Sequence, residues 1–394
     1  MGSFTNIESV FMSSNLMDSM ERFFDRPELR LPIEWRWGED PGSSMRSRTD
    51  EFFSILGKVS SKGVDKTSIL RSKKASELLM KAIECSLKGD IASSFPAFEA
   101  AMTNLGDALP KGDESTCGTG AKYRDKLLFR MRNSQKQHLD KEDLFHIPFQ
   151  KRFKVASERF SVVGSPCLYL GGSVYTCWEE MGRPPFQDLH VSAFWIAEPT
   201  AFLDLRMTPS AISKKLKSSL WKDRGDEREQ FARSELSKLA HIWPLMALCM
   251  IKVDEPDGAF KPEYIVPQMT LQWIATNGQL DGVAYASCQT LVRCQQGIES
   301  LSNYAFPVKH FQASGRCVDL CKRFRMTDPI NWSLLGAMDL HVGERPEEYG
   351  IRVADGVESS SGETEFGKIE RALFALRNRI SRMGLQNEGV VSHL

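Results

Sequence analysis

The sequence predicts an α+β protein, in which a mixed β-sheet core with surrounding helices follows a mainly helical N-terminal region. In residues 73–109 apolar side chains recur at helical spacing, with one break at Gly89-Asp90. From residue 127 onward, short runs rich in β-branched and aromatic residues alternate with helical patterns. With 394 residues, 41% of them apolar, the chain can bury a large core and carry an appended domain.

The N-terminal region is expected to span residues 1–115. Its first 60 residues look irregular, because aromatic residues are interspersed there with Pro, Gly, Ser and Arg. Residues 73–109 then predict a helical hairpin, and the Gly, Asp, Ser and Thr-rich residues 110–122 predict the domain boundary. Residues 118–122 are no phosphate loop, because the glycine spacing fails and no apolar strand precedes them.

A second domain is expected at residues 120–345, beginning with a strand at 127–132. Residues 208–240 predict a helical, charged insert with a solvated face. A helix is expected over residues 267–275. The other predicted strands lie at residues 191–196, 201–205, 280–287 and 303–307.

Residues 346–394 are expected to form a linker followed by one amphipathic basic helix, at about 365–383. The apolar stripe of this helix is more typical of a docking face than of a membrane contact. Its members are Ile369, Leu373, Leu376 and Ile380.

Charge balance and hydropathy bear on the class of partner. The chain has 51 basic and 51 acidic residues, so no overall field indicates nucleic acid or an anionic membrane. The longest apolar run, residues 242–251, is interrupted by Pro244 and is far shorter than the roughly twenty residues that span a bilayer. We expect this run to be a buried strand or a core helix.

Cysteine usage predicts a reducing, cytoplasmic location. The nine cysteines are odd in number and irregularly spaced, and no charged-then-apolar leader opens the sequence. Cys317 and Cys321, with Cys288 and Cys294 upstream, lack zinc-finger spacing and a histidine partner. We therefore expect core thiols and no metal site.

Residues 159–180 change structural period most sharply. Val162-Val163 and residues 167–170 are β-favouring runs on either side of turn residues, which predicts a hairpin. Ser173 or Thr176 can cap the helix that follows, and Thr176 and Glu179 have capping-box spacing. The three side chains expected to face one cleft are Arg159 and Tyr169 from the edge of the hairpin and Glu180 from the helix.

This stretch resembles the RES-domain family, whose core has an arginine-aromatic start, a Leu-Tyr strand and a glutamate on the following helix. Tyr169 lies ten residues after Arg159, and Glu180 lies eleven after Tyr169, as in the Arg-Tyr-Glu set of that family. The Tyr-x-Ser strand that ends at Ser287 and the strand at residues 303–307 are similar to the closing section of RES domains. The resemblance implies a fold like that of ADP-ribosyltransferase toxins, with NAD as a consumed substrate rather than a cofactor. It also implies a toxin of the kind often paired with an antitoxin.

The chemistry that the resemblance implies suits these residue types. Cleavage of the bond between nicotinamide and ribose develops positive charge on the ribosyl carbon, which the carboxylate of Glu180 could stabilise. Arginine fits phosphate oxygens, and Arg159 is the first candidate, with Arg130 or Arg132 next. Tyr169 offers a stacking surface for nicotinamide, and Ser287 could hydrogen-bond the amide or the ribose.

Several alternatives stay open at this point. The nucleophile could be water, phosphate, or a protein or small molecule, which would make the protein an ADP-ribosyltransferase. The chain could also be an inactive scaffold that binds a partner. An uncertain helix start could exchange Glu179 and Glu180. Ser287 could simply end a strand, and His146 could be a general base but is more often, in such a setting, a packed loop residue.

Overall fold

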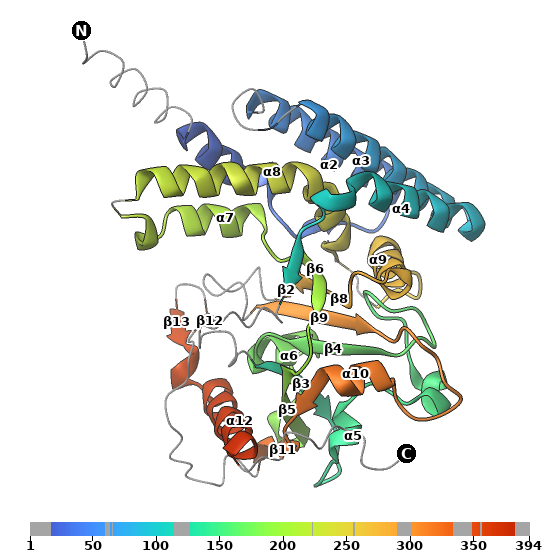
Figure 1. Ribbon diagram of the computed structural model, residues 1–394, viewed down its shortest axis with the longest axis vertical. Coiled ribbons are helices and arrows are strands. Elements are labelled where there is room, and N and C mark those ends of the chain that lie inside the picture. Colours follow the sequence, from blue (N-terminus) through green and yellow to red (C-terminus); the bar gives the residue numbers. More distant parts are fainter. Residues whose placement is uncertain are drawn as a thin grey trace. The chain divides into compact units, whose positions relative to one another are not determined.

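The computed structural model describes residues 17–59, 64, 66–113, 127–222, 224–254, 257–289, 301–333, 349–354 and 357–382 (Figure 1). The chain divides into two compact units. The first combines Met1–Pro110 with Met207–Met269, and the second combines Lys111–Arg206 with Thr270–Leu394. Residues 207–269, which contain the expected insert 208–240, therefore cluster with the N-terminal region. The C-terminal helix clusters with the sheet.

The first unit is mainly helical. Helix α2 (Pro41–Val59) covers a stretch that was expected to be irregular, and that expectation was wrong. The side chain of Asp40 accepts a hydrogen bond from Ser43 N at the start of α2 (2.7 Å), and Phe52 and Leu56 are buried along one face. The elements of this unit are α2 (Pro41–Val59), α3 (Lys66–Leu87), α4 (Ile91–Leu105), α7 (Pro209–Leu216), α8 (Gly225–Cys249) and the parallel pair β1 (Ile33–Trp35) and β7 (Ile251–Val253).

The predicted helical hairpin is confirmed as α3 and α4. Gly89 has φ +78°, a conformation that glycine adopts at low cost, and the chain reverses there. Asp90 then caps α4 by accepting a hydrogen bond from Ser93 N (3.1 Å).

Residues 207–269 are tied to the N-terminal segment by polar and aromatic contacts within the unit. Asp25 accepts hydrogen bonds from Ser213 Oγ and Lys217 Nζ, each at 2.5 Å. The hydrogen bond from Lys217 is the largest of the effects that lower the pKa of Asp25. Phe52 of α2 stacks on Trp243 of α8, with ring centroids 4.4 Å apart. The N-terminal segment and residues 207–269 are separate in sequence, yet they share one core.

Most of the long apolar run at residues 242–251 lies in helix α8. Residues 242–249 are all buried and helical, with Pro244 inside the helix. The choice between buried strand and core helix is therefore decided in favour of the helix. Among the described residues, no helix has both the length and the hydropathy to cross a membrane.

The second unit is built on a nine-stranded mixed sheet, which confirms the α+β class. The strands are β2 (Lys111–Asp113), β3 (Leu128–Asn133), β4 (Cys167–Gly171), β5 (Leu189–Ile196), β6 (Ala201–Leu205), β8 (Gly282–Ala286), β9 (Ser302–Pro307), β10 (Phe324–Met326) and β11 (Ile330–Asn331). Their order in the sheet is β10-β5-β3-β4-β9-β8-β6-β2, and β11 also pairs with β5. Only β6 and β8 are parallel; the other described pairs of this sheet are antiparallel.

Helices cover the two faces of this sheet. Short helices α5 (Lys141–Leu144) and α10 (Val318–Arg323) contribute to one apolar cluster, with Leu168 and Phe306 of the sheet. Helices α6 (Val174–Glu180) and α12 (Glu365–Arg382) contribute to the other, with Phe129 and Val191. Helix α9 (Ile265–Thr276) leads into β8, and β12 (Gly350–Ala354) pairs with β13 (Val357–Ser360) ahead of α12. The 3₁₀ segments are Pro27–Leu29, Gly106–Ala108, Phe149–Lys154, Phe186–Asp188, Ser219–Trp221, Pro262–Tyr264 and Ser361–Glu363.

The predicted hairpin before α6 is wrong in its first half. Strand β4 forms as expected, but it pairs with β9 and β3 instead of with Val162-Val163. Val163 is 71% exposed and lies in no strand. Gly164 has φ +75° in the turn, so the turn chemistry was correct while its strand partner was not.

Candidate active site

Helix α6 presents Glu180 as its last residue. Ser173 is the N-cap, since its Oγ accepts a hydrogen bond from Thr176 N (3.1 Å). Thr176 is therefore inside the helix, and the capping box between Thr176 and Glu179 does not form. Glu179 is 5% exposed and is bound by Arg183 through two bonds, Nε to Oε2 at 3.0 Å and Nη2 to Oε1 at 2.8 Å.

Arg183 explains why the two neighbouring glutamates differ. It has φ 60°, a strained conformation for a residue with a side chain, directly after Gly182 at φ 75°. Its guanidinium lies over the ring of Trp178, 5.4 Å from the centroid, and holds Glu179. Glu179 is thus part of the turn that ends the helix.

The carboxylate of Glu180 is held by two donors from neighbouring strands. Ser287 Oγ donates to Glu180 Oε1 at 2.6 Å, and Asn303 Nδ2 donates to the same oxygen at 2.7 Å. Ser287 and Asn303 are buried, at 0% and 6% exposure, whereas Glu180 is an exposed residue. Hydrogen bonds to an ionised acceptor are short and strong, so this arrangement fixes a carboxylate at the protein surface.

Tyr169 is hydrogen-bonded to the two residues that follow Arg159. Its hydroxyl donates to Ser161 Oγ at 3.0 Å and accepts from Phe160 N at 3.3 Å. Burial raises the pKa of Tyr169 well above its usual value, so the phenol stays protonated. Arg159 is partly exposed beside these anchored residues.

Tyr285 is a buried phenol whose pKa responds to the charges of both Glu180 and Arg159. Burial is the main cause that raises its pKa well above the usual value; the charge of Glu180 raises it further and that of Arg159 opposes. Both charged groups therefore lie within electrostatic range of one phenol. The ring of Tyr285 packs on Phe160 with centroids 4.4 Å apart. The β8–β9 register pairs Tyr285 with Asn303.

Sequence reasoning assigned no role to Asn303 or Tyr285. A single asparagine or tyrosine on a strand gives no local signal. The pairing of β8 with β9 sets Tyr285 opposite Asn303, which donates to Glu180. The Tyr-x-Ser pattern was the one available clue to Tyr285. For Ser287, the structure shows a donor to Glu180 that also accepts from Gln289 N at 3.2 Å.

The two other candidate arginines, Arg130 and Arg132, lie on β3. Arg130 Nη1 donates to the backbone carbonyl of Tyr169 (3.3 Å), so it supports the seam between β3 and β4. Burial, and then the like charge of Arg132, lower the pKa of Arg130 to about 10. The described contacts of these two arginines do not join them to the Glu180 carboxylate.

His146 is a packed structural residue, as the more favoured interpretation had it. It is fully buried; its Nε2 accepts from Cys317 N at 2.9 Å, and its Nδ1 lies 2.8 Å from the Ile147 carbonyl. These bonds require the neutral tautomer with hydrogen on Nδ1. Burial lowers the pKa of His146 to about 4.

Three of the four cysteines expected in the core are buried, namely Cys288, Cys317 and Cys321, and Cys294 falls outside the described residues. Within the part of the chain that the structure describes, no group of His, Cys, Asp and Glu could hold a metal ion.

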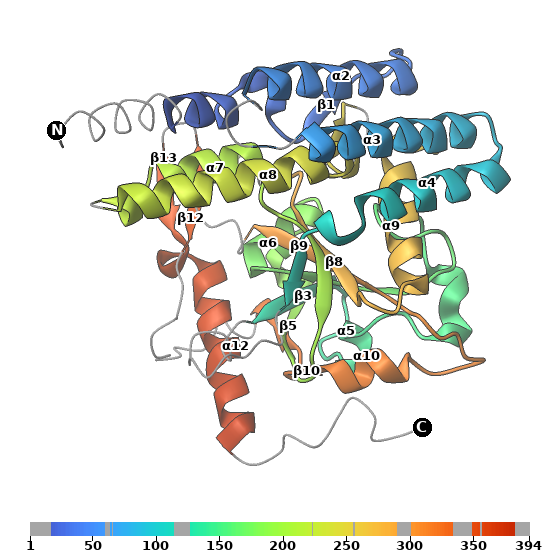
Figure 2. The same cartoon turned by 45° about the horizontal axis from the view of Figure 1, so that its top comes forward.

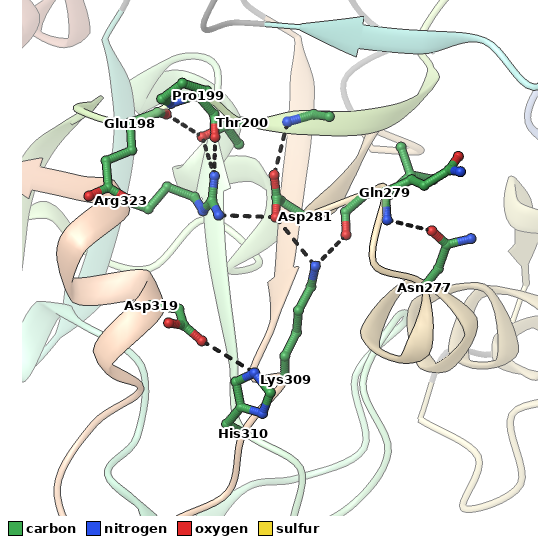
Figure 3. A network of polar contacts seen from close by, with 12 residues as sticks. Glu198, Pro199, Thr200, Asn277, Gln279, Asp281, Lys309, His310, Asp319 and Arg323 are labelled. Carbon is green, nitrogen blue, oxygen red and sulfur yellow. Dashed lines mark hydrogen bonds and ion pairs between the residues drawn. The ribbon is translucent and has the colours of Figure 1, made fainter.

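A polar network anchors the other end of β8 (Figure 3). Asp281, just before β8, accepts a hydrogen bond from Ala201 N at 3.0 Å. Its other carboxylate oxygen contacts Lys309 Nζ at 3.3 Å and Arg323 Nη2 at 3.1 Å. Strand β8, which precedes Ser287, is therefore registered against β6 at its start.

Comparison with known proteins adds one relative. The chain is similar to a protein of Bacillus subtilis (strain 168) named "Putative toxin YopC". The two are 29% identical over 359 residues, which cover 88% of this chain and 79% of that protein. No family model matches the chain, and no solved structure matches it. The similarity favours a toxin-like role and names no activity.

Proposed function

We propose that this protein is a RES-type toxin that cleaves the nicotinamide–ribose bond of NAD and acts by depleting it. The observation that carries the proposal is the exposed Glu180 carboxylate, whose Oε1 is held by Ser287 and Asn303. A pre-positioned carboxylate is the group that a developing oxocarbenium ion requires. The toxin name of the relative and the Arg-Tyr-Glu spacing support the same function.

In the proposed reaction, the bond between the ribosyl carbon C1′ and the nicotinamide nitrogen breaks. The electron pair of that bond goes to the nicotinamide ring, which leaves as a neutral base. Water or phosphate forms the new C1′–O bond, and an attacking water releases one proton. No oxidant or reductant is consumed, because NAD is the substrate.

The side chains of the site divide these tasks. Glu180 faces the positive charge that develops on the ribose, while Ser287 and Asn303 position its carboxylate. Arg159 binds the pyrophosphate of NAD, since its donor fork fits phosphate oxygens. Tyr169 presents its ring to nicotinamide and, through its hydroxyl, holds the residues next to Arg159. We propose that the protein acts in the cytoplasm. A partner antitoxin would control its activity there.

The test is nicotinamide release from NAD by the purified full chain, with and without inorganic phosphate. Glu180→Gln keeps the size and hydrogen-bonding oxygen of the side chain but removes its charge. We expect a loss of at least about a hundredfold in kcat, the scale of one electrostatic group in the transition state. Glu198→Gln, at an exposed position of the same unit, is the matched control and should leave turnover unchanged.

The other outcomes separate the alternatives. Label carried from NAD onto a macromolecule would make the protein an ADP-ribosyltransferase. NAD binding without turnover would identify an inactive scaffold. Turnover by Glu180→Gln at the wild-type rate would overturn the proposed role of the carboxylate.

A further inference from the structure

A buried glutamate from another helix contacts the start of α6, the end opposite to Glu180. Glu370 of α12 is 1% exposed, and its Oε1 accepts hydrogen bonds from Val174 N at 2.7 Å and Tyr349 Oη at 2.8 Å. Val174 is the first residue of α6. The contact between Val174 and Glu370 links residues 196 positions apart in the chain.

The chemistry of this contact favours a tight connection. A buried carboxylate is costly unless it is hydrogen-bonded, and the first amides of a helix carry partial positive charge. Tyr349 is itself fixed, since its amide donates to Ser361 Oγ at 3.0 Å and its carbonyl accepts from Ser361 N at 2.8 Å. The C-terminal segment thus presents a rigid acceptor to the start of α6.

Helix α6 depends on such support. It has seven residues, and isolated helices of that length are not stable in water. Six residue steps at about 1.5 Å each place Glu180 only about 9 Å along the axis from Val174. A tilt at the first turn therefore moves the carboxylate directly.

Packing fixes the sides of α6 as well. Helix α12 contacts both α6 and β5 (Figure 2). Phe366 of α12 packs on Tyr175 and Trp178, with ring centroids 5.3 and 5.4 Å apart. On the β4 side, a Cβ added at Gly171 would lie 2.7 Å from Cys177 Sγ, so only glycine allows this approach.

We propose that Glu370 is a positioning residue, which holds α6 so that Glu180 stays within reach of Ser287 and Asn303. The C-terminal helix is then an integral part of the active centre. This inference rests on the proposed NAD-cleaving function for its kinetic effect. Its structural effect can be measured without turnover.

The test compares Glu370→Ala, Glu370→Gln and the control Glu365→Ala, an exposed position of α12. Glutamine keeps an oxygen that can accept both hydrogen bonds, whereas alanine removes it. For Glu370→Ala we expect at least a tenfold loss of kcat, with KM changed less than twofold because Arg159 and Tyr169 lie on other segments. Glu370→Gln should recover most of kcat, and Glu365→Ala should match the wild type.

Amide hydrogen exchange of residues 174–180 supplies the readout that does not need activity. Protection there should fall in Glu370→Ala and return in Glu370→Gln, while β8 and β9 keep theirs. Should Glu370→Ala not fold, Tyr349→Phe removes one of the two donors and should give a smaller change of the same kind.

Two results would overturn the inference: wild-type kcat in Glu370→Ala, or wild-type protection of residues 174–180 in that variant. If the wild-type protein does not cleave NAD, the proposed function fails. The exchange data then decide the positioning role alone.

Discussion

Two hydrogen-bond donors that differ in chemistry hold the carboxylate of Glu180. The hydroxyl of Ser287 and the amide of Asn303 both donate to the same oxygen, Oε1. Either donor can be removed without removing the carboxylate. Their variants therefore separate positioning of Glu180 from its charge.

Asn303→Asp should move the acid limb of the pH–activity profile to higher pH. Two carboxylates within hydrogen-bonding distance cannot both be ionised at low cost, so the pair in the variant should keep a shared proton up to a higher pH. Asn303→Ala should instead lower kcat by about tenfold to a hundredfold at every pH, through loss of position alone. Rates of nicotinamide release from pH 5 to 9 distinguish the two effects. Asn277→Asp, which keeps its acceptor oxygen for Gln279 N, should show neither.

His146 makes the free energy of unfolding depend on pH. Its pKa is about 4 in the folded protein and about 6.5 in the unfolded chain, so the unfolded state binds more protons between these values. The contribution is therefore complete above pH 6.5 and is lost as pH falls towards 4, at up to about 1.4 kcal/mol per pH unit. Urea unfolding across this range should show a shallower dependence in His146→Gln. The same slope in both proteins would contradict the buried neutral histidine, and exposed His310→Gln is the control.

At the element scale, long periodic segments were predictable and short pairings were not. The helical hairpin and helix α12 have strong periodic patterns, and the structure contains both. Strand β2 has the sequence Lys-Gly-Asp and no apolar signal; it exists because it pairs with β6. Gly112 permits that pairing, since a Cβ there would meet the Phe202 ring at 2.2 Å.

The candidate site shows the same limit. Local turn and capping chemistry placed Glu180 at the end of a helix and Ser287 at the end of a strand, but only tertiary pairing brings them to 2.6 Å. The contact of Glu370 with Val174 could not be foreseen, because no sequence pattern links a C-terminal helix to an amide 196 residues away.

The network around Asp281 should contribute more to the free energy of unfolding than the exposed contact between Asp319 and His310. Asp281→Ala leaves Ala201 N and two cations without their acceptor, so we expect a loss of about 2 kcal/mol in the free energy of unfolding. Asp319→Ala removes only an exposed contact with His310 at 3.7 Å and should cost about 0.5 kcal/mol or less. Chemical denaturation of both variants gives the comparison. Equal losses would show that the network does not anchor β8.

At the scale of the whole molecule, the chain crosses between its compact units more than once. Residues 207–269 return to the N-terminal helices, and the sheet then resumes with β8 and β9. Both strands that hold Glu180 therefore follow this excursion in the chain. The predicted insert 208–240 belongs to this excursion, and its helix α8 continues to Trp243, which stacks on Phe52.

Trp243→Ala tests whether these distant segments form one cooperative unit. The fully buried indole stacks on Phe52, so its removal should lower the free energy of unfolding by about 3–5 kcal/mol. If the segments share one core, hydrogen exchange should accelerate in α2 as well as in α8, because a cooperative unit opens together. Leu220→Ala, at a side chain that is 65% exposed, should change neither stability nor exchange. Acceleration confined to α8 would mean that residues 207–269 are stabilised independently of the N-terminal helices, as a true insert would be.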